Sequence, residues 1–262
     1  MLANSQYFRS GPDYRFDDAA SFSQIRDTFG FASVRVGKWV TDEEAEKAAN
    51  LLFDALADLA FILNVPPATL GLRQKLNLDF GIGGRPGVQA HYAPQTRTLA
   101  LAKNAGTGAL AHEFWHALDH HLADTAFVND VSMSASAINF ATDLWLKDRR
   151  LKSHPVNQAL ELLLREIFLQ GRGQDANSFV TQAISLDKQM NRDYFAMPTE
   201  LGARAFEACI ESSAEITNRF LVQGTLKQDE QTRLAYPTLP HRARILQCLR
   251  QYFQCLADFL PV

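Results

Sequence analysis

The feature that most constrains this chain is a pair of histidines, His112 and His116, inside a run of helical apolar spacing over residues 108–122. Residues four apart on a helix lie on the same face, so both imidazoles reach one metal ion. Glu113 lies about 100° round the same helix, beside that ion. This spacing is typical of helices that hold catalytic zinc, and a second segment must then supply a third ligand.

The strongest candidate for the third ligand lies on a helix expected near residues 199–211. Glu200 falls in its first turn, and Glu207, nearly on the same face, is the competing candidate. For an arbitrary helix, a solvated face with Arg204 as the intrahelical partner of these acids would be the better explanation. The link to the histidine pair favours the metal role, and we expect Glu200 ahead of Glu207.

The expected cofactor is Zn²⁺, and the remaining polar residues have expected roles around it. Glu113 is expected to take a proton from water that the metal activates and to deliver it to the leaving amine. Tyr194 is a candidate hydrogen-bond donor to the oxyanion, although a half-buried amphipathic tyrosine is an equally good explanation. Asp119 stays on the metal face and is a candidate for orienting a ligand imidazole.

Three further histidines leave alternatives open. His120 or His121 is an alternative ligand if the helix ends early, but exposed histidines near the negative end of a helix dipole are commoner. His91 either points toward the site or lies on the exposed face of a strand.

Composition narrows the class of protein. The 262 residues carry 26 basic and 29 acidic side chains without a block of one sign, and 47% are hydrophobic. Neither a membrane nor nucleic acid is therefore expected as a partner, and the oligomeric state is open. Three cysteines are expected to be reduced core thiols. The N-terminus lacks the apolar stretch of a signal peptide, which predicts a cytoplasmic protein.

The pattern along the chain predicts an α+β, predominantly helical fold in one domain of residues 1–262. An irregular arm over 1–20 precedes an α/β lobe near 21–125, and a helical lobe follows near 126–262. The first lobe should hold a strand within 31–40, a helix over 42–63 and a hairpin of strands 88–92 and 96–102. Residues 70–78 are ambiguous. Helices are expected near 135–151, 157–170, 178–189, 199–211 and 240–259.

Several stretches resemble one known family. Residues 29–40, 79–92, 106–119 and 198–207, and then Tyr236 and Pro237, resemble the large polyvalent protein-associated domain 1 family, whose stand-alone bacterial relatives are labelled CLCA_X proteins. The resemblance implies a zincin-like metallopeptidase domain of the type found in large proteins of phages and conjugative elements. The order of its motifs is also similar to the gluzincins.

The resemblance implies His112 and His116 as zinc ligands, Glu113 as the base and Glu200 as the third ligand. Tyr194 matches a gluzincin tyrosine in position. The chain departs from the family at Trp115, where a small residue is usual, so that a bulky indole either fills part of the cleft or changes the packing of the helix.

Two functions follow as hypotheses. The first is a zinc-dependent peptidase acting on a peptide or protein substrate, which the strand over 96–102 is expected to bind along the sheet edge. The second is a zinc-binding accessory domain with little or no catalysis. Glu113 favours the enzyme, because a structural zinc site has no need of a base. A nucleic-acid accessory role finds no support in the charge pattern.

Overall fold

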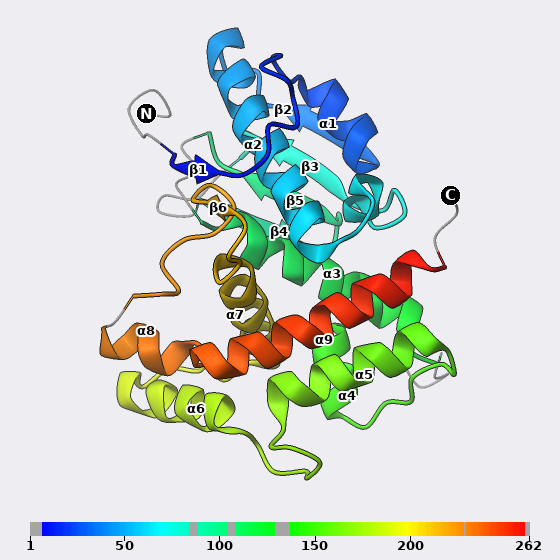
Figure 1. Cartoon of the computed structure of the whole chain (residues 1–262), viewed down its shortest axis with the longest axis vertical. Coiled ribbons are helices and arrows are strands. Elements are labelled where there is room, and N and C mark those ends of the chain that lie inside the picture. Colours follow the sequence, from blue (N-terminus) through cyan, green and yellow to red (C-terminus); the bar gives the residue numbers. More distant parts are fainter. Residues whose placement is uncertain (1–6, 84–88, 104–107, 129–136, 228, 260–262) are drawn as a thin grey trace. The chain divides into compact units, whose positions relative to one another are not determined.

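The computed structural model is α+β and mostly helical, as the sequence pattern predicts (Figure 1). Two compact units divide the chain: the first comprises Met1–Ala117 with Ser213–Gln223, and the second comprises Leu118–Ser212 with Gly224–Val262. The predicted boundaries at residues 20 and 125 remain predictions. The structure describes residues 7–83, 89–103, 108–128, 137–227 and 229–259.

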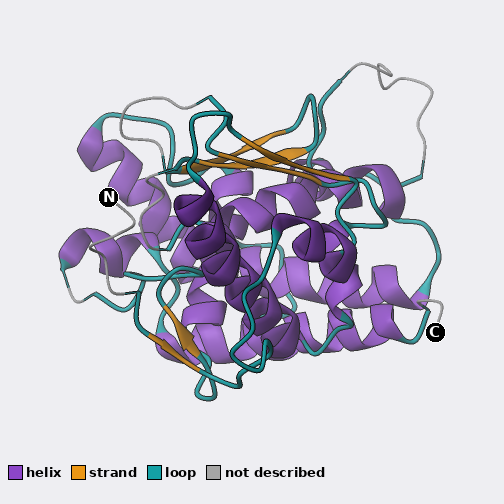
Figure 2. Ribbon diagram, turned by 90° about the horizontal axis from the view of Figure 1, so that it is seen from above, coloured by secondary structure: helices purple, strands orange, loops and turns teal. Residues whose placement is uncertain are grey.

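The first unit is built on a mixed sheet of four strands. These are β2 (Ser33–Val36), β3 (Asn77–Phe80), β4 (Ala90–Ala93) and β5 (Thr98–Leu101). Their order is β2-β3-β5-β4, with β2, β3 and β5 parallel and β4 antiparallel to β5. Figure 2 shows them as one sheet, apart from the short pair β1 (Arg9–Ser10) and β6 (Thr217–Asn218).

Strand β3 falls in the stretch that sequence periodicity leaves ambiguous. It is only four residues long and carries a buried aspartate, Asp79, which interrupts the apolar pattern. The guanidinium of Arg35 on β2 donates to both Asp79 oxygens, at 2.8 and 2.6 Å. A cross-strand ion pair therefore allows the charge on an inner strand.

Two helices pack beside this sheet with clear sequence signals for their ends. The predicted helix over 42–63 is α2 (Asp42–Leu63), where Thr41 and Glu44 form a capping box and Leu52, Leu56, Leu59 and Leu63 are buried. Helix α1 (Phe22–Phe29) ends at Gly30, whose φ is 70°. A Cβ there would lie 2.7 Å from the Ala68 carbonyl oxygen, so glycine is required.

Residues 7–20, the described part of the N-terminal arm, are mostly irregular, and ion pairs fix them. Arg9 donates to both oxygens of Asp58, each at 2.7 Å, and Asp58 is fully buried on α2. Arg15 makes a similar bidentate pair with Asp54 one turn earlier, at 2.8 and 3.1 Å. These pairs hold the arm along α2.

The second unit is helical, and Figure 1 shows α5 and α9 lying along one another. The predicted helices are present, although α4 is shorter than expected and residues 135–136 lie outside the described part. Helix α8 was not predicted, because six residues are too few for a periodic signal. The helices that lie wholly in this unit are α4 (Ala141–Leu146), α5 (Pro155–Phe168), α6 (Ser178–Met190), α7 (Pro198–Glu211), α8 (Glu230–Ala235) and α9 (Leu239–Ala257).

Of the three cysteines, Cys209 is buried, as predicted for a core thiol, whereas Cys248 and Cys255 are only partly buried. Cys209, Cys248 and Cys255 are all free, and burial raises the pKa of the Cys209 thiol far above its usual range. Among the described residues, no helix is both long and apolar enough to cross a membrane.

Candidate metal centre

The His-Glu-x-x-His motif lies on α3 (Leu110–Ala126), one continuous helix. From Leu110 to Ala123, all of which the structure describes, only His112, Glu113 and His116 are not buried. The Nε2 atoms of the two histidines lie 3.2 Å apart. The i, i+4 spacing therefore brings both imidazoles together on the one partly open face of this stretch.

The start of α3 is fixed by backbone contacts within the first unit. The Gly108 and Ala111 N–H groups donate to the carbonyl oxygens of Phe220 and Leu221, at 3.3 and 3.0 Å. Gly108 has a φ of 95°, and a Cβ there would lie 2.6 Å from the Gln223 nitrogen. A glycine is thus required where the chain enters the helix, two residues before its first turn.

Glu113 is held by the sheet. Its Oε2 accepts a hydrogen bond of 2.8 Å from the backbone N–H of Tyr92 on β4. Strand β4 is the edge strand beside β5, and this N–H points away from β5. The predicted hairpin is present as β4 and β5, and β4 is its outer strand in the described sheet, because β5 lies between β3 and β4. The open edge is β4, which carries an exposed His91.

Glu200 lies in the first turn of α7, after Pro198, as predicted. Among the described residues, one group of candidate metal ligands is close together: a ring nitrogen from each of His112 and His116 and a carboxylate oxygen of Glu200 all lie within 4.8 Å. All three residues are half-buried. The competing candidate, Glu207, accepts a hydrogen bond of 2.9 Å from the Tyr236 hydroxyl and is not in this group.

The donor set fits zinc. Two imidazole nitrogens and one carboxylate oxygen form a usual protein ligand set for catalytic zinc, which leaves a fourth position for water. Donor atoms at about 2.0–2.1 Å from a tetrahedral zinc lie about 3.3 Å from one another. The 3.2 Å between the two Nε2 atoms agrees with that spacing, and the Glu200 oxygen lies within 4.8 Å of both ring nitrogens.

The loop before α7 is fixed by one carboxylate. Asp187 accepts hydrogen bonds from the backbone N–H groups of Tyr194, Phe195 and Ala196, at 3.1, 2.9 and 2.7 Å. Burial acts to raise the Asp187 pKa, but these three bonds outweigh it and leave the pKa lowered. Tyr194 itself is 39% exposed, and the Arg192 guanidinium lies 5.0 Å from its ring centre. Its expected role toward an oxyanion stays a prediction.

The end of the motif helix differs from expectation. His120 and His121 are only 6% and 7% exposed, so the interpretation as exposed helix-end histidines is wrong. Helix α3 continues for five residues beyond His121, which keeps both side chains inside the unit that begins at Leu118. Asp119 is 1% exposed and accepts from the backbone N–H and the hydroxyl of Thr142, at 2.8 and 2.7 Å. Its orienting role toward a ligand histidine stays a prediction.

Trp115, which stands where the similar family usually has a small residue, is 1% exposed. It lies on the buried side of α3 with Phe114, also 1% exposed, whereas the histidines lie on the half-exposed side. The indole is therefore part of the packed interior and leaves the open face of the motif to His112, Glu113 and His116.

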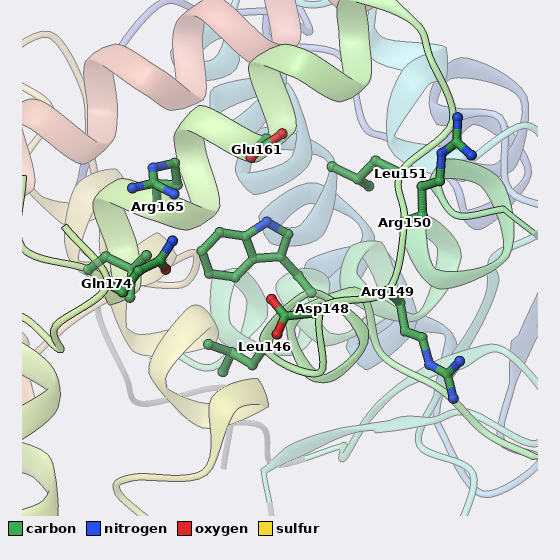
Figure 3. A pocket seen from close by; sticks show the side chains of 10 residues that line it. Leu146, Asp148, Arg149, Arg150, Leu151, Glu161, Arg165 and Gln174 are labelled. Atoms are coloured by element: carbon green, nitrogen blue, oxygen red, sulfur yellow. The ribbon is translucent and has the colours of Figure 1, made fainter. Parts of the chain in front are cut away.

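A cavity of about 520 Å³ lies elsewhere, wholly within the second unit (Figure 3). Figure 3 shows Arg165 and Gln174 on one side and Leu151 on the other, with Glu161 and Asp148 between them. Arg165 is fixed by the carbonyl oxygens of Arg172 and Gly173. No sequence signal pointed to this cavity, because its lining comes from turns and helix ends, and none of the predicted site residues lines it.

The comparisons with known proteins concern the C-terminal part of the chain, which includes Ser213–Gln223 of the first unit. Residues 186–260 match the family model of the large polyvalent protein-associated domain 1, and this segment includes α7 with Glu200. No curated protein and no solved structure matches the chain. The family match does not reach the histidine motif at 112–116. Residues 186–260 are therefore similar to the large polyvalent protein-associated domain 1, as the sequence resemblance predicts.

Proposed function

We propose that the protein is a zinc-dependent hydrolase of peptide bonds with a zincin-like fold. The observation that carries this proposal is the group of His112, His116 and Glu200, whose candidate ligand atoms lie within 4.8 Å on half-buried residues. Zinc bound by this donor set would activate a water molecule and polarise the substrate carbonyl. Helix α3 and the mixed sheet with its antiparallel edge strand β4 support the zincin-like assignment.

Glu113 is the general base in this proposal. It neighbours His112 on α3, and the Tyr92 N–H holds its carboxylate at the edge of β4. A carboxylate in this position removes a proton from the attacking water and passes it to the amine nitrogen as the carbon–nitrogen bond breaks. The Tyr92 bond limits the rotation of the carboxylate.

The substrate would be an extended peptide. Strand β4 is the edge strand of the described sheet, and an extended chain adds to such an edge through backbone hydrogen bonds, apart from the Tyr92 N–H that donates to Glu113. Tyr194 is the proposed donor to the carbonyl oxygen, because its partly exposed hydroxyl-bearing ring lies six residues before Glu200. A donor aimed at a developing oxyanion contributes to the rate only in the transition state.

The test is cleavage of a broad peptide library by the full chain loaded with one equivalent of zinc. The wild type should cleave a subset of peptides, and Glu113→Gln should retain zinc while losing at least about 100-fold in rate, the usual scale for a general base. Glu161→Gln, an exposed glutamate of α5, is the matched control and should retain full activity.

The alternative function is a zinc-binding accessory domain. If the zinc-loaded wild type cleaves no peptide in the library, the accessory function replaces the peptidase. If Glu113→Gln cleaves as fast as the wild type, the base assignment is wrong even though the metal centre stands.

A further inference from the structure

Arg204, one turn after Glu200 on α7, is a buried cation with few hydrogen bonds. Its side chain is 3% exposed, and one of its terminal nitrogens donates to the carbonyl oxygen of Phe195. The other two guanidinium nitrogens, Nε and Nη1, are buried and have no hydrogen-bond partner in the described part of the chain. Two strong donor groups are thus left unused in the interior.

Such an arrangement is costly. Burial lowers the pKa of Arg204, opposed by the attraction of Glu200 and other nearby groups. Hydrogen bonds to all of its nitrogens normally offset the free-energy cost of removing a guanidinium from water. Arg242, the other buried arginine of this unit, has that set: it donates to Pro237 and to both Thr225 oxygens at 2.6–2.8 Å. Arg204 therefore lacks the hydrogen bonds that Arg242 makes.

Burial also decides which anion the unused donors can serve. Nε and Nη1 are each closed to solvent, so a ligand from outside does not reach them without rearrangement of the unit. The acceptor for Nε and Nη1 must therefore be a group within the second unit. Glu207 accepts from Tyr236, and Asp187 accepts from three backbone N–H groups. Glu200, on the same helix, is within ion-pair distance of the guanidinium: its Oε2 lies 4.0 Å from Nη1.

We propose that Arg204 is a positioning residue that orients the Glu200 carboxylate for the metal. A small rotation of the glutamate brings one oxygen within hydrogen-bond distance of Nη1 and leaves the other oxygen for the ion. The inference rests on the proposed metal centre. Arg204 lies one turn from Glu200 on the same helix, so the pair is set by α7 alone and needs no other element.

The geometry of the guanidinium matters for this role. A fork of rigid N–H donors fixes both the position and the plane of a carboxylate, whereas an ammonium fixes only distance. The rings of Tyr194 and Phe195 lie 5.6 and 5.0 Å from the guanidinium carbon and hold the fork in place. Removing hydrogen-bond partners of metal ligands typically costs 10–100-fold in metal affinity.

The experiment is competitive Zn²⁺ titration of the full chain against a chelator, with wild type, Arg204→Met, Arg204→Lys, Glu200→Gln and the double variant Arg204→Met/Glu200→Gln. Arg204→Met should weaken zinc binding about 10–100-fold, and Arg204→Lys should recover part of the loss. In the Glu200→Gln background, Arg204→Met should change the affinity by less than about twofold, because the carboxylate that it orients is gone.

Thermal unfolding without metal separates positioning from a purely structural role. Arg204→Met should unfold at or above the wild-type temperature, whereas Arg242→Met should unfold well below it. If Arg204→Met fails to fold, the Arg204→Lys variant carries the affinity test alone. Equal zinc affinity of the wild type and the folded Arg204 variants would overturn the positioning role while leaving the metal centre intact. A wild type that binds no zinc would overturn the proposed function and this role together.

Discussion

The two ends of α7 differ in how completely their charged side chains are hydrogen-bonded. At the C-terminal end, Glu207 accepts from Tyr236, and Glu211 accepts from the Gly224 N–H and from Thr225. At the N-terminal end, Arg204 has one hydrogen bond and Glu200 lies among the candidate metal ligands. The same helix thus carries hydrogen-bonded charges at one end and, at the other, the charges to which we assign the proposed metal site.

Hydrogen bonding distinguishes Glu200 from Glu207, two acids that sequence spacing alone does not separate. Glu200 and Glu207 lie seven residues apart on nearly the same face of α7, and Arg204 lies between them in the sequence. Glu207 lies in a closed network with Tyr236, and burial together with Glu207 raises the pKa of that phenol far above its usual range. A carboxylate in such a network stabilises the fold, and its partner would be left unpaired if it moved to a metal.

The largest expected difference lies between the two buried arginines. Arg242→Met should lower the free energy of unfolding by about 3–5 kcal/mol, because it leaves the carbonyl oxygens of Pro237 and Thr225 without donors. Arg204→Met should change it by less than about 1 kcal/mol, since it removes one bond and a poorly paired buried charge. Urea denaturation of the metal-free proteins measures both. Equal losses for the two variants would remove the distinction between the ends of α7.

A smaller effect is expected at the loop that leads into the N-terminal end. Asp187→Asn should cost about 1–3 kcal/mol, because a neutral amide is a weaker acceptor for the three backbone N–H groups. The Asp187 pKa is lowered in the folded state, so its contribution is present above the ordinary aspartate range and is lost as pH falls through the folded value.

Unfolding by urea at a series of pH values tests this loop. The wild type and Asp187→Asn should differ fully above about pH 5, and the difference should shrink as pH falls below the ordinary aspartate range. A difference that does not change over this range would show that the Asp187 charge has no part in holding the loop.

The smallest expected effect concerns the closed network. Tyr236→Phe should cost about 1–2 kcal/mol at neutral pH, because Glu207 loses a buried donor. The folded pKa of Tyr236 is raised, so its contribution is present below the ordinary tyrosine value and is lost as pH rises above about 10. The wild type should therefore lose more stability than Tyr236→Phe between pH 9 and 11. Parallel profiles would contradict the burial of this phenol.

Much of the fold follows from local signals in the sequence. The capping box at Thr41 and Glu44 and the apolar spacing behind it predict α2 at both ends. Strand β3 is different, because its Asp79 is tolerated only through Arg35 on a strand 44 residues earlier, and no local pattern contains that pairing. The position of β5 inside the sheet is likewise not contained in a local pattern, because β5 pairs with β3 on one side and with β4 on the other.

Some features of the candidate site are also predictable from local spacing, and others are not. Helical spacing is enough to predict the meeting of His112 and His116, and a proline-led first turn is enough to nominate Glu200. The burial of His120 and His121 depends on how far α3 continues, and the unused donors of Arg204 depend on what surrounds it. These features arise from packing between segments that are distant in the sequence, which single-sequence patterns do not contain.

The most direct test of the metal centre is the zinc content of the purified full chain after dialysis, measured by mass spectrometry of the metal. We expect about one zinc per chain in the wild type and in Glu207→Gln, and loss of zinc in His112→Ala and Glu200→Gln. Zinc retained by Glu200→Gln but lost from Glu207→Gln would contradict the assignment of the two ends of α7. A wild type without zinc would contradict the metal centre itself.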